Sequence, residues 1–175
     1  TGTQVTVDVA DFEQVGQAAG QPAGSVSVTS KGADPTGSGD STQAFRDAIA
    51  AAQGGVVWIP PGDYRLTSSL GGVQNVTLQG AGSWYSVVHT SRFIDQSSAS
   101  GGVHIKDFAV MGEVTERVDS NPDNFVNGAL GPNSSVSGMW IQHLKVGLWL
   151  MGDNDNLVVE NNRILDTTAD GLNLN

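Results

Sequence analysis

The feature that most constrains the fold is a weak similarity among three short segments in the second half of the chain. These segments are IKDFAV (105–110), IQHLKV (141–146) and VENNRI (159–164), and each has apolar residues at its first and sixth positions. Their starting positions, 105, 141 and 159, lie 36 and 18 residues apart. The spacing predicts an 18-residue repeat, with two repeats, or one repeat and a long loop, in the first interval. Short strands and turns at such a period, without helices between them, are typical of a parallel β-helix, in which each coil stacks on the previous one.

A two-sheet sandwich would also contain short, regularly spaced strands. A sandwich favours tight hairpins, and no Asn-Gly or Asp-Gly turn joins alternating strands in the register of the repeat. We therefore expect an all-β chain that folds as a right-handed parallel β-helix.

One stretch has a clear helical pattern. Asp40 can cap a helix at 42–52, apolar residues recur there at a spacing of three and four, and Gly54-Gly55 can end it. The open end of a β-helix exposes apolar side chains and unpaired strand edges. We expect this amphipathic N-terminal α-helix to cap that end.

The first 24 residues differ in composition from the rest. An alternating stretch at 5–9 is followed by QVGQAAGQPAG (14–24), which is small, polar and typical of a linker. We interpret 1–24 as an N-terminal strand segment with a linker, and 25–175 as the coils of one domain. A long acidic loop, rich in Asn and Gly, is expected at 112–135, and such loops on rigid scaffolds commonly carry function.

Charge and composition exclude several partners. The chain has 8 Lys and Arg against 18 Asp and Glu, a formal net charge of −10, which disfavours a nucleic-acid backbone, an anionic membrane or an acidic polymer as partner. It has no cysteine, so disulfides and thiolate chemistry are excluded. No signal-peptide pattern opens the sequence, so the chain is either cytosolic or already processed, and no apolar run reaches membrane-spanning length.

Asp170 is the leading candidate for chemistry. It lies in an Ala-Asp-Gly sequence just before LNLN (172–175), where alternation would place the leucines inside the coil and Asp170 with Asn173 outside. The simple alternative is an Asx turn, in which the carboxylate only accepts a nearby backbone N–H, and spacing alone favours that interpretation. Glycoside hydrolysis needs two carboxyl groups. None of the neighbouring acids makes a convincing second one: Asp153, Asp155, Glu160 and Asp166.

Other residue types give weaker signals. Trp84 and Tyr85 follow the turn GAGS (80–83) and could stack on sugar rings, although aromatic residues at strand spacing more often belong to the core. The stretch GDNDN (152–156) lacks the ligand spacing of a calcium loop, which leaves a structural calcium ion open but unsupported. The three histidines lack metal-ligand spacing. We expect no metal site and no required cofactor.

Longer segments resemble known families. The run VTSKGADPTGSGDSTQAFRDAIAAAQGGVVWIPPGDYRL (28–66) resembles the N-terminal cap of the pectate-lyase-like β-helix superfamily, which indicates an architecture and not an activity. More specifically, glycoside hydrolase family 87, the α-1,3-glucanases and mycodextranases, is similar to several later segments: GAGSWYSVVH, FAVMGEVTERVDSN, NGALG, KVGLWL and NNRILDTTADGLNLN. The resemblance runs from about Val26 to Asn175. Residues 7–28 also resemble the connection between the accessory domains and the catalytic β-helix of these enzymes.

The family resemblance implies a mechanism. It implies endo-type, inverting hydrolysis of α-1,3-glucan by three aspartates on neighbouring coils. Asp170 matches the aspartate of the family's Ala-Asp-Gly motif, where it would orient and deprotonate the attacking water. The other two aspartates form an adjacent pair about one coil further on, and this chain contains no such pair. Residues 25–175 are therefore expected to be the N-terminal coils of an incomplete catalytic domain, either a fragment or one piece of a nicked enzyme, inactive without the C-terminal coils as partner.

The same resemblance implies a secreted bacterial protein whose partner is α-1,3-glucan polysaccharide. A neutral glucan is not repelled by a chain with a net charge of −10. The candidates for substrate contact are Trp84, Tyr85, Glu116, Arg117, Asp119 and Asn173.

Two other classes stay open. A polygalacturonase-like hydrolase would share the fold and the aspartates, but it needs a basic subsite, and the later coils offer only Lys106, Arg117, Lys145 and Arg163. A non-catalytic β-helix, such as an adhesin or a tailspike segment, would bind glycan without Asp170. Glucan binding that survives the substitution Asp170→Asn, without hydrolysis, would favour the non-catalytic class. A pectate lyase fits least, because it needs clustered calcium carboxylates.

Overall fold

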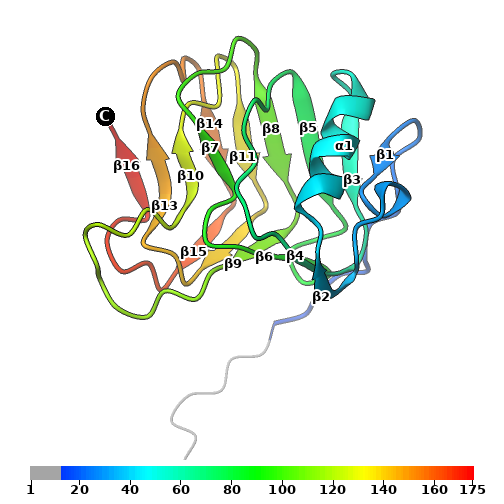
Figure 1. Ribbon diagram of the computed structural model, residues 1–175, viewed down its shortest axis with the longest axis horizontal. Helices are drawn as coiled ribbons and strands as arrows, with labels where there is room; N and C mark the ends of the chain where they lie inside the picture. Colours follow the sequence, from blue (N-terminus) through cyan, green and yellow to red (C-terminus); the bar gives the residue numbers. More distant parts are fainter. Residues whose placement is uncertain (1–12) are drawn as a thin grey trace, which may run out of the picture.

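The computed structural model describes residues 13–175 and shows a parallel β-helix (Figure 1). All strand pairs are parallel, and they form three sheets that run along the stack of coils. Within residues 13–175 the only helices are α1 (Thr42–Ala52) and a 3₁₀ turn, Thr29–Lys31. Neither helix is long and apolar enough to cross a membrane. The expected all-β solenoid is confirmed.

A full coil adds one strand to each of the three sheets. Sheet A contains β1 (Val26–Ser27), β3 (Val56–Ile59), β5 (Val76–Gly80), β8 (Val103–Lys106), β11 (Ser135–Ser137) and β14 (Val158–Glu160). Sheet B contains β2 (Thr36–Asp40), β4 (Gly62–Arg65), β6 (Ser86–His89), β9 (Ala109–Met111), β12 (Trp140–Gln142) and β15 (Arg163–Leu165). Sheet C contains β7 (Ile94–Gln96), β10 (Asn124–Gly128), β13 (Val146–Leu150) and β16 (Leu172–Leu174).

Columns of like side chains form the core. In sheet C, Leu172 pairs in register with Leu148, which continues through Val126 to Ile94, and the last three are fully buried. Leu172 and Leu174 are 46% and 70% exposed because β16 is the last strand of its sheet. Alternation in LNLN therefore points the leucines along the core column, as the sequence predicts.

The helix α1 closes the N-terminal end of the stack (Figure 1). It buries Phe45 and Ala48 against the first coils, and the ring of Phe45 meets the ring of Tyr64 edge-on at 5.8 Å. The predicted cap residue is wrong by one position: Ser41 is the N-cap, because Asp40 still belongs to β2. The Asp40 carboxylate nevertheless accepts the backbone N–H of Thr42 at 2.9 Å, so it satisfies a free donor of the first helical turn.

The predicted 18-residue period is wrong. In sheet A, Ile105 pairs with Val136, and Val136 pairs with Val159, so these coils are 31 and 23 residues long. Ile141 lies instead in sheet B, between Val110 and Ile164. The true counterpart of the other two segments is VSGMWI (136–141). Because apolar residues enter the core from more than one sheet, IQHLKV has the same apolar pattern as the other two segments. It nevertheless begins five residues after their true counterpart.

Residues 13–19 lie along the outside of several coils. Ala19 donates its N–H to Ala81 O at 2.8 Å, the Tyr85 hydroxyl donates to Gly16 O, and Glu13 forms an ion pair of 2.6 Å with Arg163. These contacts link the segment before β1 to coils that are up to 150 positions away in the sequence. The alternating stretch expected at 5–9 lies outside the described residues.

Candidate functional site

The previous coil fixes the position of Asp170, which lies in the turn between β15 and β16. Its carbonyl oxygen accepts Gly147 N–H at 3.0 Å, and the next carbonyl, of Gly171, accepts Leu148 N–H at 3.0 Å. The carboxylate is exposed, and Oδ2 accepts the side-chain amide of Asn173 at 2.9 Å. No other residue of the described chain donates to this carboxylate. The contacts therefore do not support a simple Asx turn, and Oδ1 is free to meet a ligand.

Gly147 allows the coils to approach closely beside Asp170. A methyl group on Gly147 would lie 2.3 Å from the carbonyl oxygen of Gly171, which is far inside van der Waals contact. Gly147 has an ordinary backbone conformation, so a glycine is needed there because no side chain fits, and not because of backbone freedom. The close approach places the Asp170 turn directly on β13.

The expected long loop is shorter than the sequence predicts. Residues 124–128 form β10, with Phe125 and Val126 buried, so the irregular loop covers 112–123. Two asparagines in NFVNG (124–128) gave this strand the composition of a turn. The loop folds over the next coil: Val114 donates its N–H to His143 O at 2.8 Å.

Lys145 anchors the same loop. Its side chain is only 6% exposed, and Nζ donates to Asp119 O at 2.8 Å while lying 5.5 Å from the centre of the Trp149 ring. Its backbone N–H donates to Asp123 O at 2.8 Å. Lys145 therefore holds both sides of the loop, one through its buried ammonium group and the other through its backbone N–H.

The loop pairs two of the predicted candidates, Arg117 and Asp119, with each other. Arg117 Nε donates to Asp119 Oδ1 at 2.7 Å, and this hydrogen bond and charge raise the pKa of Arg117, with a smaller contribution from the charge of Asp170. Arg117, and more weakly Lys145, lower the pKa of Asp119. Arg117 thus interacts directly with Asp119 and, more weakly, with the charge of Asp170.

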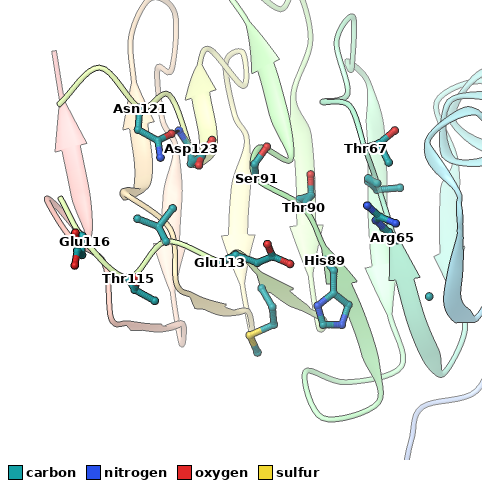
Figure 2. Close-up of a pocket in the computed structure, with 14 residues that line it drawn as sticks. Arg65, Thr67, His89, Thr90, Ser91, Glu113, Thr115, Glu116, Asn121 and Asp123 are labelled. Atoms are coloured by element: carbon teal, nitrogen blue, oxygen red, sulfur yellow. Dashed lines mark hydrogen bonds between the residues drawn. The ribbon is translucent and has the colours of Figure 1, made fainter. Parts of the chain in front are cut away.

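A groove of about 660 Å³ follows the C-terminal ends of the sheet B strands (Figure 2). Arg65, His89 and Met111 lie on its floor and pair in register, and the same row continues through Gln142 to Leu165, five residues before Asp170. The loop 112–123 forms one wall, and Glu116 lines the groove next to Arg117 in the sequence. The side chains labelled in Figure 2 are hydroxyl, amide, carboxylate, imidazole and guanidinium groups from successive coils: Arg65, Thr67, His89, Thr90, Ser91, Glu113, Thr115, Glu116, Asn121 and Asp123.

Most of the residues that line this groove could not be recognised from the sequence. His89 pairs with Asp63 on the neighbouring strand at 3.1 Å, and both lie on sheet B. The signal was the position of Arg65, His89 and Met111 at the C-terminal ends of sheet B strands, but that position can be recognised only once the coil register is known. Such a dense set of donors and acceptors suits a polyhydroxylated ligand.

A polar column lies on the outward face of sheet C. Asn173 pairs in register with Trp149, Trp149 with Asn127, and Asn127 with Asp95. The Asn127 amide donates to Asp95 at 2.8 Å, and this hydrogen bond is the main cause that lowers the pKa of Asp95. Asn173, a predicted candidate, thus continues a row of polar and aromatic side chains. Its other members, Asp95, Asn127 and Trp149, were not predicted from the sequence.

The structure does not bring Trp84 and Tyr85 together with Asp170. Both precede β6, whereas Asp170 follows β15, so they lie at opposite ends of the sheet B strands. The Tyr85 hydroxyl donates a hydrogen bond to the carbonyl oxygen of Gly16, and Trp84 packs against Trp140.

The stretch GDNDN (152–156) serves as an inter-coil turn. The carbonyl oxygens of Asp153 and Asp155 accept the N–H groups of Gly131 and Asn133 at 3.1 and 2.7 Å. Among the residues that the structure describes, no group of three His, Asp or Glu side chains could hold a metal ion.

The fold and groove define a pectate-lyase-like β-helix. Residues 25–127 match the family described as "Rhamnogalacturonase A/epimerase, pectate lyase-like". More specifically, the chain belongs to glycoside hydrolase family 87. It is 85% identical to the catalytic unit of the thermostable GH87 α-1,3-glucanase from Streptomyces thermodiastaticus strain HF3-3, with a TM-score of 0.92 over 94% of this chain and 30% of that chain. The resemblance inferred from the sequence is confirmed.

Two further solved structures are similar. The catalytic domain of Agl-KA is 27% identical, with a TM-score of 0.80 over 92% of this chain and 32% of that chain. The A-module of mannuronan C-5 epimerase AlgE6 from Azotobacter vinelandii is 20% identical, with a TM-score of 0.54 over 81% of this chain and 50% of that chain, and supports the fold alone. No curated protein sequence matches the chain. The chain spans about a third of the length of the Streptomyces catalytic unit and of the Agl-KA catalytic domain.

Proposed function

We propose that this chain forms the N-terminal coils of the catalytic domain of an endo-acting α-1,3-glucanase that inverts the anomeric configuration. The observation that carries the proposal is the exposed Asp170 carboxylate, held on one oxygen by Asn173 at 2.9 Å, in a chain 85% identical to a solved α-1,3-glucanase catalytic unit.

Asp170 acts as the base that activates water. An inverting glycosidase uses one carboxylate to deprotonate water on one face of the sugar and one carboxylic acid to protonate the leaving oxygen, with the two groups roughly 6.5–9.5 Å apart to leave room for that water. The Asn173 amide fixes the carboxylate through Oδ2, so Oδ1 faces the water. The positive charge of Arg117 interacts with the charge of Asp170.

The proton donor comes from outside this chain. An adjacent Asp-Asp pair is needed about one coil after Asp170, and the sequence contains no adjacent aspartates. This chain corresponds to 30% of the length of the related catalytic unit, which leaves room for such a coil in a longer protein. The remainder of the domain is therefore an obligatory partner, and residues 25–175 alone do not hydrolyse glucan.

The groove binds the polymer. Hydroxyl and carboxylate groups along the ends of sheet B provide hydrogen-bond partners for sugar hydroxyls over several coils, as an endo-acting enzyme requires. Glu116, Arg117 and Asp119 contact sugar near Asp170, and Trp149 offers an indole ring on the outward face of sheet C. The enzyme acts outside the bacterial cell, where an insoluble glucan is found.

The test uses a catalytic unit in which this chain is followed by its C-terminal coils; we call this protein the extended unit. Reducing ends released from α-1,3-glucan and from polygalacturonate are compared, and NMR identifies the first anomer released. Release from α-1,3-glucan alone, with the β-anomer formed first, supports the proposal. Release from polygalacturonate, or glucan binding without release that survives Asp170→Asn, would replace it with one of the two alternative classes.

A further inference from the structure

A cluster of aromatic side chains lies at the N-terminal ends of the sheet B strands, away from Asp170. The rings of Trp84 and Trp140 meet edge-on at 4.7 Å, and the guanidinium carbon of Arg163 lies 5.7 and 5.2 Å from the two ring centres. Trp84 remains 43% exposed, which is unusual for so large an apolar side chain with such close neighbours. We name Trp84, Trp140 and Arg163 the aromatic platform.

The platform is rigid. Trp140 and Arg163 pair in register across β12 and β15, and Trp140 Nε1 donates to Gln142 at 2.9 Å. Arg163 is held from outside by Glu13 at 2.6 Å. Each ring therefore has little freedom to lose when a ligand binds, which lowers the entropic cost of binding.

We propose that the aromatic platform is a second, non-catalytic binding site for a neutral glucan chain. The apolar C–H face of a pyranose ring packs on a half-exposed indole, and shallow hollows of about 300 and 340 Å³ flank Trp84, with Ser83 in both. Glu13 neutralises Arg163, so the platform carries no free charge that would select an anionic polymer. This balance matches a neutral polysaccharide.

The site and Asp170 lie at opposite ends of the sheet B strands, so a chain on the platform does not reach the bond that is cleaved. Its role is to hold an insoluble polymer against the enzyme, which raises the local concentration of cleavable chains at the groove. The choice of α-1,3-glucan as ligand rests on the proposed function; the platform itself rests on the contacts above.

The experiment uses the extended unit with Asp170→Asn, so that the polymer is not consumed. Binding to insoluble α-1,3-glucan is measured by depletion for the parent, for Trp84→Ala and for Met151→Ala, a matched control with a 39% exposed apolar side chain in another turn. We expect Trp84→Ala to weaken binding by roughly tenfold, and Trp84→Phe to restore part of it, because one aromatic stacking contact is lost and then partly replaced. Met151→Ala should bind as the parent does.

Hydrolysis of a soluble α-1,3-gluco-oligosaccharide by the unit with Asp170 intact separates the two proposals. Trp84→Ala should leave this rate unchanged while slowing release from insoluble polymer. Equal binding of insoluble glucan by Trp84→Ala and Met151→Ala would overturn the second site. A lowered melting temperature of Trp84→Ala with unchanged binding would also overturn it, because Trp84 would then only pack against residues 13–19. Failure of the unsubstituted unit to cleave the oligosaccharide would instead contradict the catalytic proposal.

Discussion

The side-chain amide of Asn173 donates a hydrogen bond of 2.9 Å to Oδ2 of Asp170, one strand position beyond the first leucine of β16. Asn173→Ala removes the group that orients the proposed base. We expect kcat of the extended unit on α-1,3-glucan to fall by roughly tenfold, with KM and melting temperature little changed, because the lost interaction is one charge-assisted hydrogen bond at an exposed site. Asn175→Ala, two residues away, is the control. Equal kcat values for the two variants would show that Asn173 does not position Asp170.

Gly147→Ala tests the close contact between coils. The new methyl group would lie 2.3 Å from the Gly171 carbonyl oxygen, so the turn that carries Asp170 must move. We expect a loss of about 1–3 kcal/mol in the free energy of unfolding, together with lower activity. Urea denaturation measures the first effect. Gly20→Ala has no atom within 4 Å of the added methyl group and should change neither quantity; an unaltered Gly147→Ala protein would disprove the packing argument.

Lys145→Met tests the anchor of the loop 112–123. The substitution keeps the apolar stem of a buried side chain but removes the hydrogen bond to Asp119 O. We expect a modest loss of stability, about 1 kcal/mol, and several-fold faster trypsin cleavage after Arg117, because the loop opens more often. Lys106→Met is the matched control, because the Lys106 side chain forms no hydrogen bond within the described chain. Cleavage after Arg117 at the parent rate would mean that other contacts hold the loop.

Asp40→Asn tests the start of the capping helix. Hydrogen bonds from the side chains of Thr42 and Thr67 lower the pKa of Asp40 far below its ordinary value of 3.8. A carboxyl group whose pKa is depressed by folding stabilises the fold above its unfolded pKa, and the stabilisation disappears as the pH falls through the folded pKa. We therefore expect Asp40→Asn to cost about 1 kcal/mol at pH 7, and the difference from the parent to shrink below about pH 3.8.

The control for this pH series is Asp47→Asn on the exposed face of α1, where the carboxylate accepts only the Gln43 side chain. Chemical denaturation at several pH values gives both differences. A penalty for Asp40→Asn that stays constant between pH 7 and about pH 2.5 would contradict the assigned role of its charge.

Much of the architecture could be predicted from the sequence because it depends on local patterns. Alternation in LNLN, helical spacing in α1 and the lack of hairpin turns each indicate one element of a capped parallel solenoid. The coil period could not be predicted, because apolar residues enter the core from three sheets and a shift of five residues still matches Ile141 to Ile105. The strand β10 was missed for a related reason: its two asparagines resemble turn residues, although Asn124 is buried.

The candidate site divides in the same way. Asp170 and Asn173 could be found because they are close in sequence and resemble a family motif. The groove could not, since Arg65, His89 and Met111 come from coils 24 and 22 residues apart and meet only in the true register. Residue type alone made Trp84 a candidate for substrate contact. Only the three-dimensional structure shows that Trp84 and Asp170 lie at opposite ends of the sheet B strands.

The central claim is that Asp170 is the catalytic base of an α-1,3-glucanase. The most direct measurement is the release of reducing ends from insoluble α-1,3-glucan. It compares the extended unit with its Asp170→Asn and Asp166→Asn variants. Asp166 is a suitable control because it is exposed, lies four residues away and occupies a left-handed conformation that Asn tolerates. We predict that Asp170→Asn lowers the rate by at least roughly a thousandfold while Asp166→Asn retains most of it. Full activity in Asp170→Asn would contradict the account.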